Sequence, residues 1–439
     1  MGACCSMNRK FEGYMVQQEE EHDDDEKENG RREGDFGSRV MLRGSCEFAS
    51  MFTQKGRKGI NQDAMTIWED FAGEKDLIFC AVFDGHGPYG HKVAGCVRDA
   101  LPSKLSSRLK SWKLGEYDHK EDGNDASSDD VGHYSNDEAN SQDKDGGESD
   151  HNRSLCSLKT CFVKAFEDMD EELRQDSTIE SYCSGTTAVT VLKKGEHLII
   201  ANLGDSRAVL CTIDNKNQLV PIQLTVDLKP NIPSEAERIR RCGGRVFAME
   251  DERDVYRVWV PDEDYPGLAM ARAFADFCLK DFGLISTPQV SYRKITDKDE
   301  FVVMATDGVW DVLSNEEVVE IVASAQKRCM AAKLLVNHAC QAWENKYPNS
   351  KVDDCAVVCL FLKQQSSFTK TTPVLMNNES RNRRLDISPS VKIVGLVDGA
   401  HETSEDTTTA TPKEEWTAIK GFSRNNSILK LPRVLDEKI

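Results

Sequence analysis

Residues 77–87 read LIFCAVFDGHG, an apolar run of strand length that ends at Asp84 and continues into a glycine-rich turn. A carboxylate at the end of a strand is fixed in direction and open to solvent, which suits a hard divalent cation. Gly85 allows close approach of the backbone, so its carbonyl could be a further ligand. An ordinary Asp-Gly turn also explains the pattern, and for this stretch alone it is the simpler interpretation.

Three more stretches place aspartates at the beginning or end of a strand. Residues 301–311 (FVVMATDGVWD) again lead from an apolar strand to an Asp-Gly pair, and residues 204–207 (GDSR) lie between two strands. Residues 351–358 (KVDDCAVV) begin a strand with acids instead. Each has a plain interpretation as a turn or strand end. Together they form an oxygen-rich, histidine-poor set, which favours Mg²⁺ or Mn²⁺ over Zn²⁺.

Two short motifs point to other functions. Gly85, Gly87 and Gly90 match a dinucleotide-binding fingerprint, but Asp84 would face the pyrophosphate, and residues 103–113 offer no acid for a ribose. Residues 281–283 (DFG) match a kinase motif, but no HRD loop or VAIK strand precedes them. We therefore interpret both as chance matches or turns.

Composition narrows the class of protein. The 439 residues carry a formal net charge of −19, which argues against nucleic-acid binding. The fifteen cysteines are scattered through apolar segments, which indicates free thiols rather than a disulfide framework. No apolar run is long enough to span a membrane. Residues 1–44, an acidic insert at 115–153 and a tail at 364–439 are predicted to be disordered, because they are poor in apolar side chains.

The rest, residues 45–363, is predicted to form one layered α+β domain. Ser234 and Ser314 each have a glutamate three residues later, so both are expected to cap helices. Strands are expected at 77–84, 187–192, 197–203, 207–212, 301–305 and 355–362, and helices at 155–174, 234–241, 315–325 and 331–347.

Eight ordered motifs make the sequence resemble the type 2C metal-dependent protein serine/threonine phosphatases, in particular the plant-type members. They are Gly59–Asp63, Phe83–Gly87, Ser184–Ala188, Gly204–Ala208, Leu224–Pro230, Leu268–Phe274, Ala305–Asp311 and Asp353–Val358. The resemblance implies an α+β fold, a β-sandwich of two antiparallel sheets with helices on both outer faces. It also implies a cleft for two metal ions, Mg²⁺ or Mn²⁺, at one end of the sandwich.

The resemblance also assigns the ligands. Asp84 would bridge the two metals, and the carbonyl of Gly85, Asp307 and Asp353 would complete the protein ligands. Asp63 would support the site through bound water. At two further positions, Asp205 and Asp311, some members hold a weaker third metal.

The expected chemistry is hydrolysis of phosphoserine and phosphothreonine in phosphoproteins. A water shared by two divalent ions becomes hydroxide near neutral pH and attacks phosphorus. His86 would then protonate the leaving oxygen as general acid. Lys58 would bind the phosphate, although many members have arginine there.

Two more positions depart from the family pattern. Gln62 replaces a glutamate, and Ala275 replaces a glycine, which would strain the backbone if φ is positive there. These departures motivate the alternative of a catalytically weak pseudophosphatase that binds phosphoproteins.

The N-terminal residues MGACCS fit the N-myristoylation pattern, with Gly2 as acceptor and Ser6 at the preferred place. One myristoyl chain anchors weakly, and Cys4 and Cys5 could carry palmitate as a second anchor. We therefore expect a lipid-anchored monomer at the cytoplasmic face of the plasma membrane and in the cytoplasm.

Overall fold

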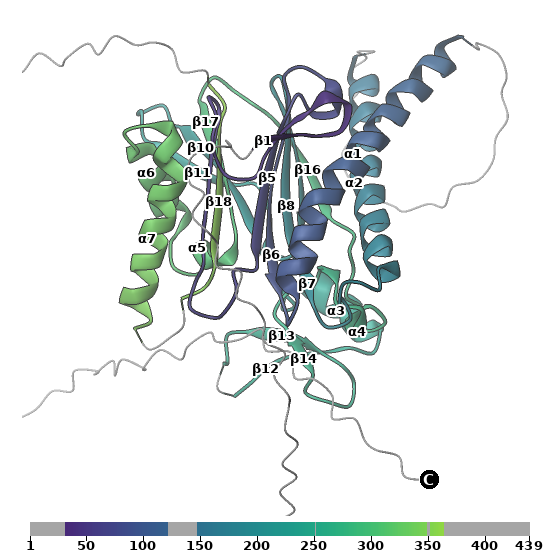
Figure 1. The fold of residues 1–439 in the computed structure, drawn as a ribbon, viewed down its shortest axis with the longest axis vertical. Coiled ribbons are helices and arrows are strands. Elements are labelled where there is room, and N and C mark those ends of the chain that lie inside the picture. Colours follow the sequence, from purple (N-terminus) through teal and green to yellow (C-terminus); the bar gives the residue numbers. More distant parts are fainter. Residues whose placement is uncertain (1–30, 122–146, 251, 349–351, 364–439) are drawn as a thin grey trace, which may run out of the picture.

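The computed structural model describes residues 31–121, 147–250, 252–348 and 352–363. Two antiparallel sheets face each other and form a sandwich (Figure 1). The first sheet contains, in order, β1 (Arg31–Glu33), β2 (Arg39–Met41), β5 (Asp63–Glu69), β6 (Leu77–His86), β8 (Ala188–Lys194), β9 (His197–Leu203) and β16 (Gln289–Lys294), while β7 (Gly185–Thr186) pairs with β6 and with β15 (Phe274–Ala275). The second contains β11 (Leu219–Gln223), β10 (Arg207–Ile213), β17 (Asp299–Ala305), β18 (Cys355–Phe361), β4 (Ala49–Gln54) and β3 (Gly44–Ser45).

Helices cover both outer faces of the sandwich (Figure 1). The long helices α1 (Gly90–Glu121) and α2 (Gly147–Gln175) pack on the first sheet, and α6 (Asn315–Ser324) and α7 (Ala331–Lys346) pack on the second. A third apolar layer fills the space between the sheets, with side chains such as Ile67, Val82 and Val358 fully buried. The expected sandwich with helices on both outer faces is therefore confirmed.

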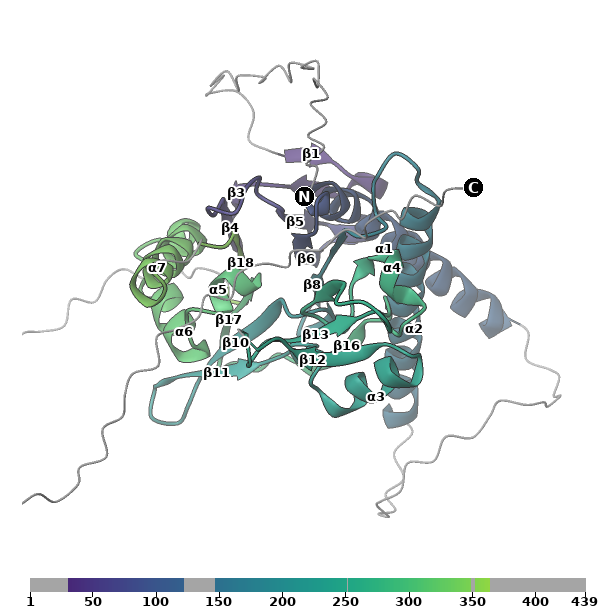
Figure 2. The same cartoon turned by 90° about the horizontal axis from the view of Figure 1, so that it is seen from below.

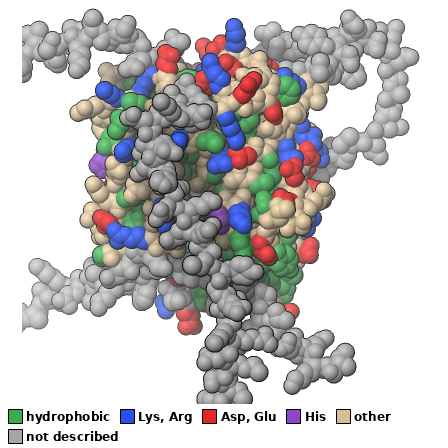
Figure 3. Space-filling model, viewed as in Figure 1, with side chains coloured by type: hydrophobic (Ala, Val, Ile, Leu, Met, Phe, Trp, Pro, Cys, Tyr) green, Lys and Arg blue, Asp and Glu red, His purple; other side chains and the backbone are tan. Residues whose placement is uncertain are grey.

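Smaller elements lie at the end of the sandwich where β6 ends. A three-stranded sheet of β12 (Arg245–Ala248), β13 (Tyr256–Trp259) and β14 (Pro266–Leu268) crosses this end, as the view from below shows (Figure 2). We call residues 245–268 the flap. The short helices α3 (Pro233–Arg241), α4 (Phe277–Lys280) and α5 (Asp307–Trp310) lie nearby. Positive and negative side chains intermingle on the face seen in Figure 3.

The structure extends the domain beyond its expected limits. The start predicted at residue 45 is corrected to about Arg31, because Val40 and Met41 are buried and β2 pairs with β5. The predicted insert at 115–153 is likewise shortened, because α1 continues to Glu121 and α2 already begins at Gly147. The remainder of that insert, residues 1–30 and the tail from 364 lie outside the described residues.

The two predicted helix caps have different outcomes. Ser314 forms the full capping box with Glu317, as expected. Ser234 does not cap α3, because Pro233 occupies the first turn and Ile232 is the N-cap. Among the described helices, none has the length and apolar character needed to cross a lipid bilayer.

Candidate active site

A cleft at this end of the sandwich has two halves that share Lys58, Asp307 and Asp353. The half beside β6 is lined by six of the seven predicted site residues, namely Lys58, Asp84, Gly85, His86, Asp307 and Asp353. The other half lies under the flap and contains both positions considered for a third metal, Asp205 and Asp311. Chain segments almost 300 residues apart in sequence therefore contribute to one cleft.

The backbone at Asp84 is fixed from two sides. Its N–H donates to the Thr187 hydroxyl at 3.0 Å, and its carbonyl accepts from the Thr187 N–H at 2.9 Å. On the other side, Asp84 is the register partner of Asp63 on β5. A side chain at Gly85 would meet the Gln62 and Gly90 carbonyl oxygens at 2.5 Å, so only glycine fits there. This packing holds Asp84 at the cleft.

Asp307 begins α5, and only Thr306 separates it from the end of β17. A Cβ at the following Gly308 would lie 1.9 Å from the Asp354 carbonyl oxygen, so this glycine lets α5 approach the start of β18. The Trp343 indole N–H donates to the Gly308 carbonyl at 2.6 Å and fixes the turn from α7. The arrangement places Asp307 next to Asp353 in the cleft.

The neighbouring carboxylates Asp353 and Asp354 have different surroundings. Asp354 accepts backbone N–H bonds from Gly56 at 2.6 Å and from Gln62 at 2.8 Å. It therefore holds the loop that carries Lys58. Asp353 forms an ion pair with Lys58 and lines both halves of the cleft. This difference supports the choice of Asp353, rather than Asp354, as the candidate ligand.

Asp63 lies behind the cleft and does not line it. Its Oδ2 accepts a hydrogen bond from the Thr306 hydroxyl at 2.8 Å. Thr306 immediately precedes Asp307, so this contact ties β5 to the start of α5. The position fits a supporting residue rather than a direct ligand.

The carboxylates in and behind the cleft favour binding of a cation. Burial, followed by repulsion from neighbouring carboxylates, raises the pKa of Asp63, Asp84 and Asp307 well above the usual range. A bound divalent cation would relieve both effects, and an all-oxygen donor set suits Mg²⁺ or Mn²⁺. Among the described residues, no group of three or more acidic, histidine or cysteine side chains lies close enough together to hold a metal ion by itself. An open cleft of this kind still suits Mg²⁺, which usually keeps several waters and few carboxylates.

His86 forms a buried pair with Asp276, from the segment after β15. The His86 Nε2 lies 2.5 Å from the Asp276 Oδ2. Burial lowers the pKa of His86, but the Asp276 carboxylate outweighs it, and the pKa is raised overall. The other ring nitrogen, Nδ1, makes no hydrogen bond within the described parts of the chain. It is buried, and it is the ring nitrogen of His86 that Asp276 does not engage.

The backbone that carries Asp276 is strained. Ala275 has φ of 58° and Asp276 has φ of 50°, both in the left-handed region that favours glycine. The sequence predicts a strained backbone at Ala275 if φ is positive there, and φ is positive. The conformation is held by Asp170, which accepts the Ala275 N–H at 2.7 Å and pairs with Lys280 at 2.8 Å. In this strained backbone conformation, the Asp276 carboxylate contacts His86.

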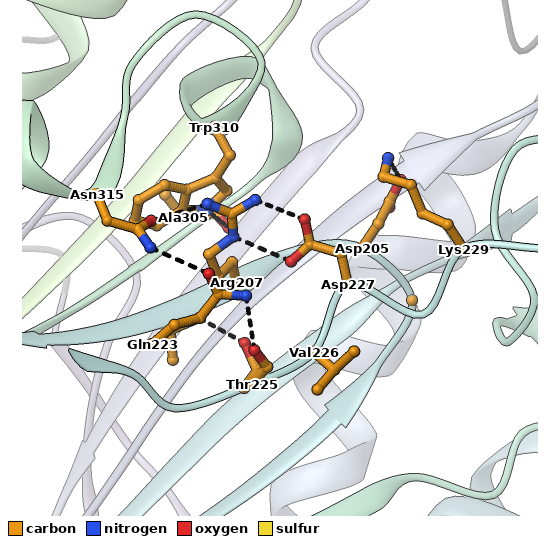
Figure 4. Close-up of polar contacts among 12 residues, drawn as sticks. Asp205, Arg207, Gln223, Thr225, Val226, Asp227, Lys229, Ala305, Trp310 and Asn315 are labelled. Carbon is orange, nitrogen blue, oxygen red and sulfur yellow. Dashed lines mark hydrogen bonds and ion pairs between the residues drawn. The ribbon is translucent and has the colours of Figure 1, made fainter. Parts of the chain in front are cut away.

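An ion-pair network lies next to the flap half, which is lined by two of its members, Asp205 and Lys229 (Figure 4). The Arg207 guanidinium donates to both Asp227 oxygens, at 3.0 and 2.6 Å, and lies over the Trp310 ring. Lys229 Nζ donates to Asp205 Oδ2 at 2.9 Å. Because Asp227 and Lys229 belong to one motif, the network joins three of the eight motifs into one support.

Sequence reasoning missed Asp276 as a partner of His86, and Thr187 and Lys229 as supports. Asp276 directly follows Ala275, which departs from the family pattern. An acid next to a residue with a strained backbone is the one local sign that Asp276 could have a functional role. Nothing in the local sequence pairs Asp276 with a histidine 190 residues earlier.

Comparison with known proteins gives consistent results. A family model described as "Protein phosphatase 2C" matches residues 49–345. The chain is 52% identical over 385 residues to "Probable protein phosphatase 2C 73" of Oryza sativa subsp. japonica, covering 88% of this chain and 87% of the relative. It is 45% identical over 442 residues to "Probable protein phosphatase 2C 33" of Arabidopsis thaliana, covering 91% and 89%.

Among solved structures, a "serine-threonine phosphatase 2C from Toxoplasma gondii" aligns with a TM-score of 0.60. The alignment covers 74% of this chain and 99% of that one, at 24% identity. At this identity the likeness concerns the fold alone.

Proposed function

The chain belongs to the protein phosphatase 2C family and is a metal-dependent protein serine/threonine phosphatase, and we propose that Asp84, the Gly85 carbonyl, Asp307 and Asp353 hold its metals. The observation that carries this proposal is that these four residues line one half of a single cleft together with His86. The substrates are phosphoproteins, and no finding favours a non-catalytic binder.

Asp84, the Gly85 carbonyl, Asp307 and Asp353 would hold two Mg²⁺ or Mn²⁺ ions per chain, since all of their donor atoms are oxygens. When bound, such ions acidify a water and offset negative charge on the phosphoryl group. Burial first, and then repulsion between neighbouring carboxylates, raises the pKa of Asp84 and of Asp307 when no cation is bound. Lys58 is then the cation nearest to Asp353 in the metal-free cleft.

The protein's own groups orient the substrate and move its proton. Lys58 binds a phosphoryl oxygen as a point charge, once Asp353 is engaged by metal. His86 lines the cleft and donates a proton to the leaving serine or threonine oxygen, because the Asp276 carboxylate outweighs burial and keeps the pKa of His86 raised. Asp63 links β5 to Thr306 behind the candidate ligands, through the hydrogen bond that it accepts from the Thr306 hydroxyl.

The proposal is tested with Asp84→Asn and Asp307→Asn. Each should abolish hydrolysis of a phosphothreonine peptide and weaken Mn²⁺ binding in calorimetry, with an unchanged circular dichroism spectrum. Metal affinity depends on ligand charge, so loss of one carboxylate is expected to matter at each position. Near-parental activity and metal affinity in either folded variant would rule out that residue as a ligand.

We also propose that the chain is anchored to the cytoplasmic face of the plasma membrane, with a cytoplasmic fraction. Myristate on Gly2 and palmitate on Cys4 or Cys5 would supply the two chains that stable anchoring requires. These residues lie outside the described part of the chain. We expect a monomer, because one chain supplies the whole cleft.

A further inference from the structure

Two exposed side chains of the flap, Asp254 and Tyr256, line the cleft. Asp254, Tyr256 and Arg257 all line the flap half. Asp254 is exposed, and the Tyr256 ring side chain is 41% exposed at the start of β13. Arg257 is instead buried and fixed, donating to Glu252 and to the Gly267 carbonyl. The flap is therefore held by Arg257, while its two neighbours remain available to a ligand.

The positive charges of this half are already engaged. Lys58 pairs with Asp353, and Lys229 pairs with Asp205 at 2.9 Å. Asp205 is nearly fully buried, and its second oxygen, Oδ1, has no hydrogen-bond partner in the part of the chain that the structure describes. The floor of the flap half thus contains a buried carboxylate oxygen, Oδ1 of Asp205, that can still accept a hydrogen bond.

Asp254 adds an uncompensated charge at the wall. Its carboxylate makes no ion pair within residues 31–121, 147–250, 252–348 and 352–363. Metals on Asp307 and Asp353 would neutralise those two carboxylates and would leave Asp254 unaffected. At the wall of the flap half, Asp254 therefore remains a negative charge even when the metal site is full.

We propose that this half binds a basic side chain of the phosphoprotein substrate, close to the phosphorylated residue, between the Asp254 carboxylate and the Tyr256 ring. The inference rests on the proposed function, since the shared Lys58, Asp307 and Asp353 make the two halves continuous. An exposed tyrosine ring attracts a cation through its face, and a carboxylate beside it adds an ion pair. Arginine suits both contacts better than lysine, because its planar group can stack and donate twice.

The test uses the full-length protein with Mn²⁺ and phosphothreonine peptides that differ at one flanking position, carrying arginine, glutamine or glutamate there. Scanning that position along both sides of the phosphothreonine should reveal a site where arginine exceeds glutamate in kcat/KM by on the order of threefold to tenfold. The preference should shrink as salt rises, because exposed charges are screened.

Variants assign the preference to the flap. The measure is the ratio of kcat/KM for the arginine peptide to kcat/KM for the glutamate peptide. Asp254→Asn should bring this ratio close to one, Asp254→Lys should bring it below one, and Asp254→Glu should keep it at the parental value. Asp262→Asn is the matched control, because Asp262 is an exposed flap carboxylate that does not line the cleft. It should leave both the ratio and the turnover unchanged.

The outcomes separate the two proposals. A parent protein that hydrolyses no phosphopeptide in Mg²⁺ or Mn²⁺ contradicts the proposed function itself. A parent that hydrolyses all peptides with equal kcat/KM, or an Asp254→Lys variant that keeps the parental ratio, overturns the inference about the flap alone.

Discussion

The His86 Nε2 lies 2.5 Å from the Oδ2 of Asp276, and both side chains are buried. The pair joins the end of β6 to a segment that follows β15, 190 residues later. Asp276 thereby engages one ring nitrogen of His86, and its carboxylate outweighs the effect of burial, raises the pKa of His86 and stabilises the protonated form.

His86→Ala should slow hydrolysis of a phosphoserine peptide by on the order of 10²–10⁴-fold, because the leaving alkoxide loses its proton donor. An aryl phosphate leaves without much protonation, so its turnover should fall far less. Steady-state assays of both substrates on one preparation make the comparison. Equal losses for the two substrates would assign His86 a structural role.

Asp353 and Asp354 allow a second comparison, between neighbouring positions. Asp353→Ala should abolish Mn²⁺-dependent activity with a smaller loss of stability, because its contacts in the metal-free cleft are one lysine and the N–H of the next residue. Asp354→Ala should destabilise the fold by about 1–3 kcal/mol, since two backbone N–H groups lose their acceptor. Urea unfolding of the metal-free variants measures the difference, and the reverse order would contradict the assignment.

Ala275→Gly should stabilise the protein by roughly 0.5–1 kcal/mol, because glycine adopts positive φ without the steric cost of a Cβ. Thermal unfolding against the parent measures this gain. Ala273→Gly is the control, since Ala273 is buried at ordinary φ and should lose stability. A destabilised Ala275→Gly variant would show that the surroundings need the methyl group.

Glu235 provides a prediction of pH dependence away from the cleft. Burial raises its pKa, but hydrogen bonds from Arg272 and Arg238 outweigh this, and the pKa is lowered from its ordinary 4.5. A lowered folded pKa means that the stabilisation is present above about pH 4.5 and is lost as pH falls through the folded value. Glu235→Gln should therefore cost about 3 kcal/mol near neutral pH, and the cost should shrink in acid.

Denaturant titrations of the parent and of Glu235→Gln at several pH values test this sign. The two unfolding free energies should converge below about pH 4.5. A difference that stays constant across the whole range would mean that the ionised carboxylate is not the stabilising species.

Membrane attachment should depend on the first six residues. Gly2→Ala removes the acceptor for myristate and should shift the protein to the soluble fraction. Cys4→Ser combined with Cys5→Ser leaves one chain, so that variant should divide between membrane and cytosol. Fractionation of proteins with a C-terminal tag provides the measurement. A Gly2→Ala protein that stays on membranes as firmly as the parent would indicate a membrane-bound partner instead.

The sequence predicted most of this architecture where the signal is local. The strand at 197–203 and the cap at Ser314 follow from apolar runs and a cap residue at fixed spacing. Arg31–Met41 was missed because only a few of its residues, such as Val40, are buried, and its order comes from pairing with β5.

The site could be predicted only as far as its motifs extend. Asp84, Asp307 and Asp353 each lie in a recognisable motif, and the fold brings them together. The contacts of Asp276 with His86 and of Asp354 with residues 56 and 62 depend on tertiary packing across the chain. No periodicity or spacing in the sequence encodes such pairs.

The place of β18 has a consequence for how the polypeptide matures during synthesis. β18 lies between β17 and β4 in the second sheet, and it begins two residues after Asp353. A nascent chain emerges from its N-terminus, so β4, which can pair early with β3, must wait for almost the whole domain before β18 is available. Such long-range pairing is slow to form. A growing chain therefore gains the core of its second sheet and its last candidate metal ligand at the same late moment, and shorter translation products would have neither.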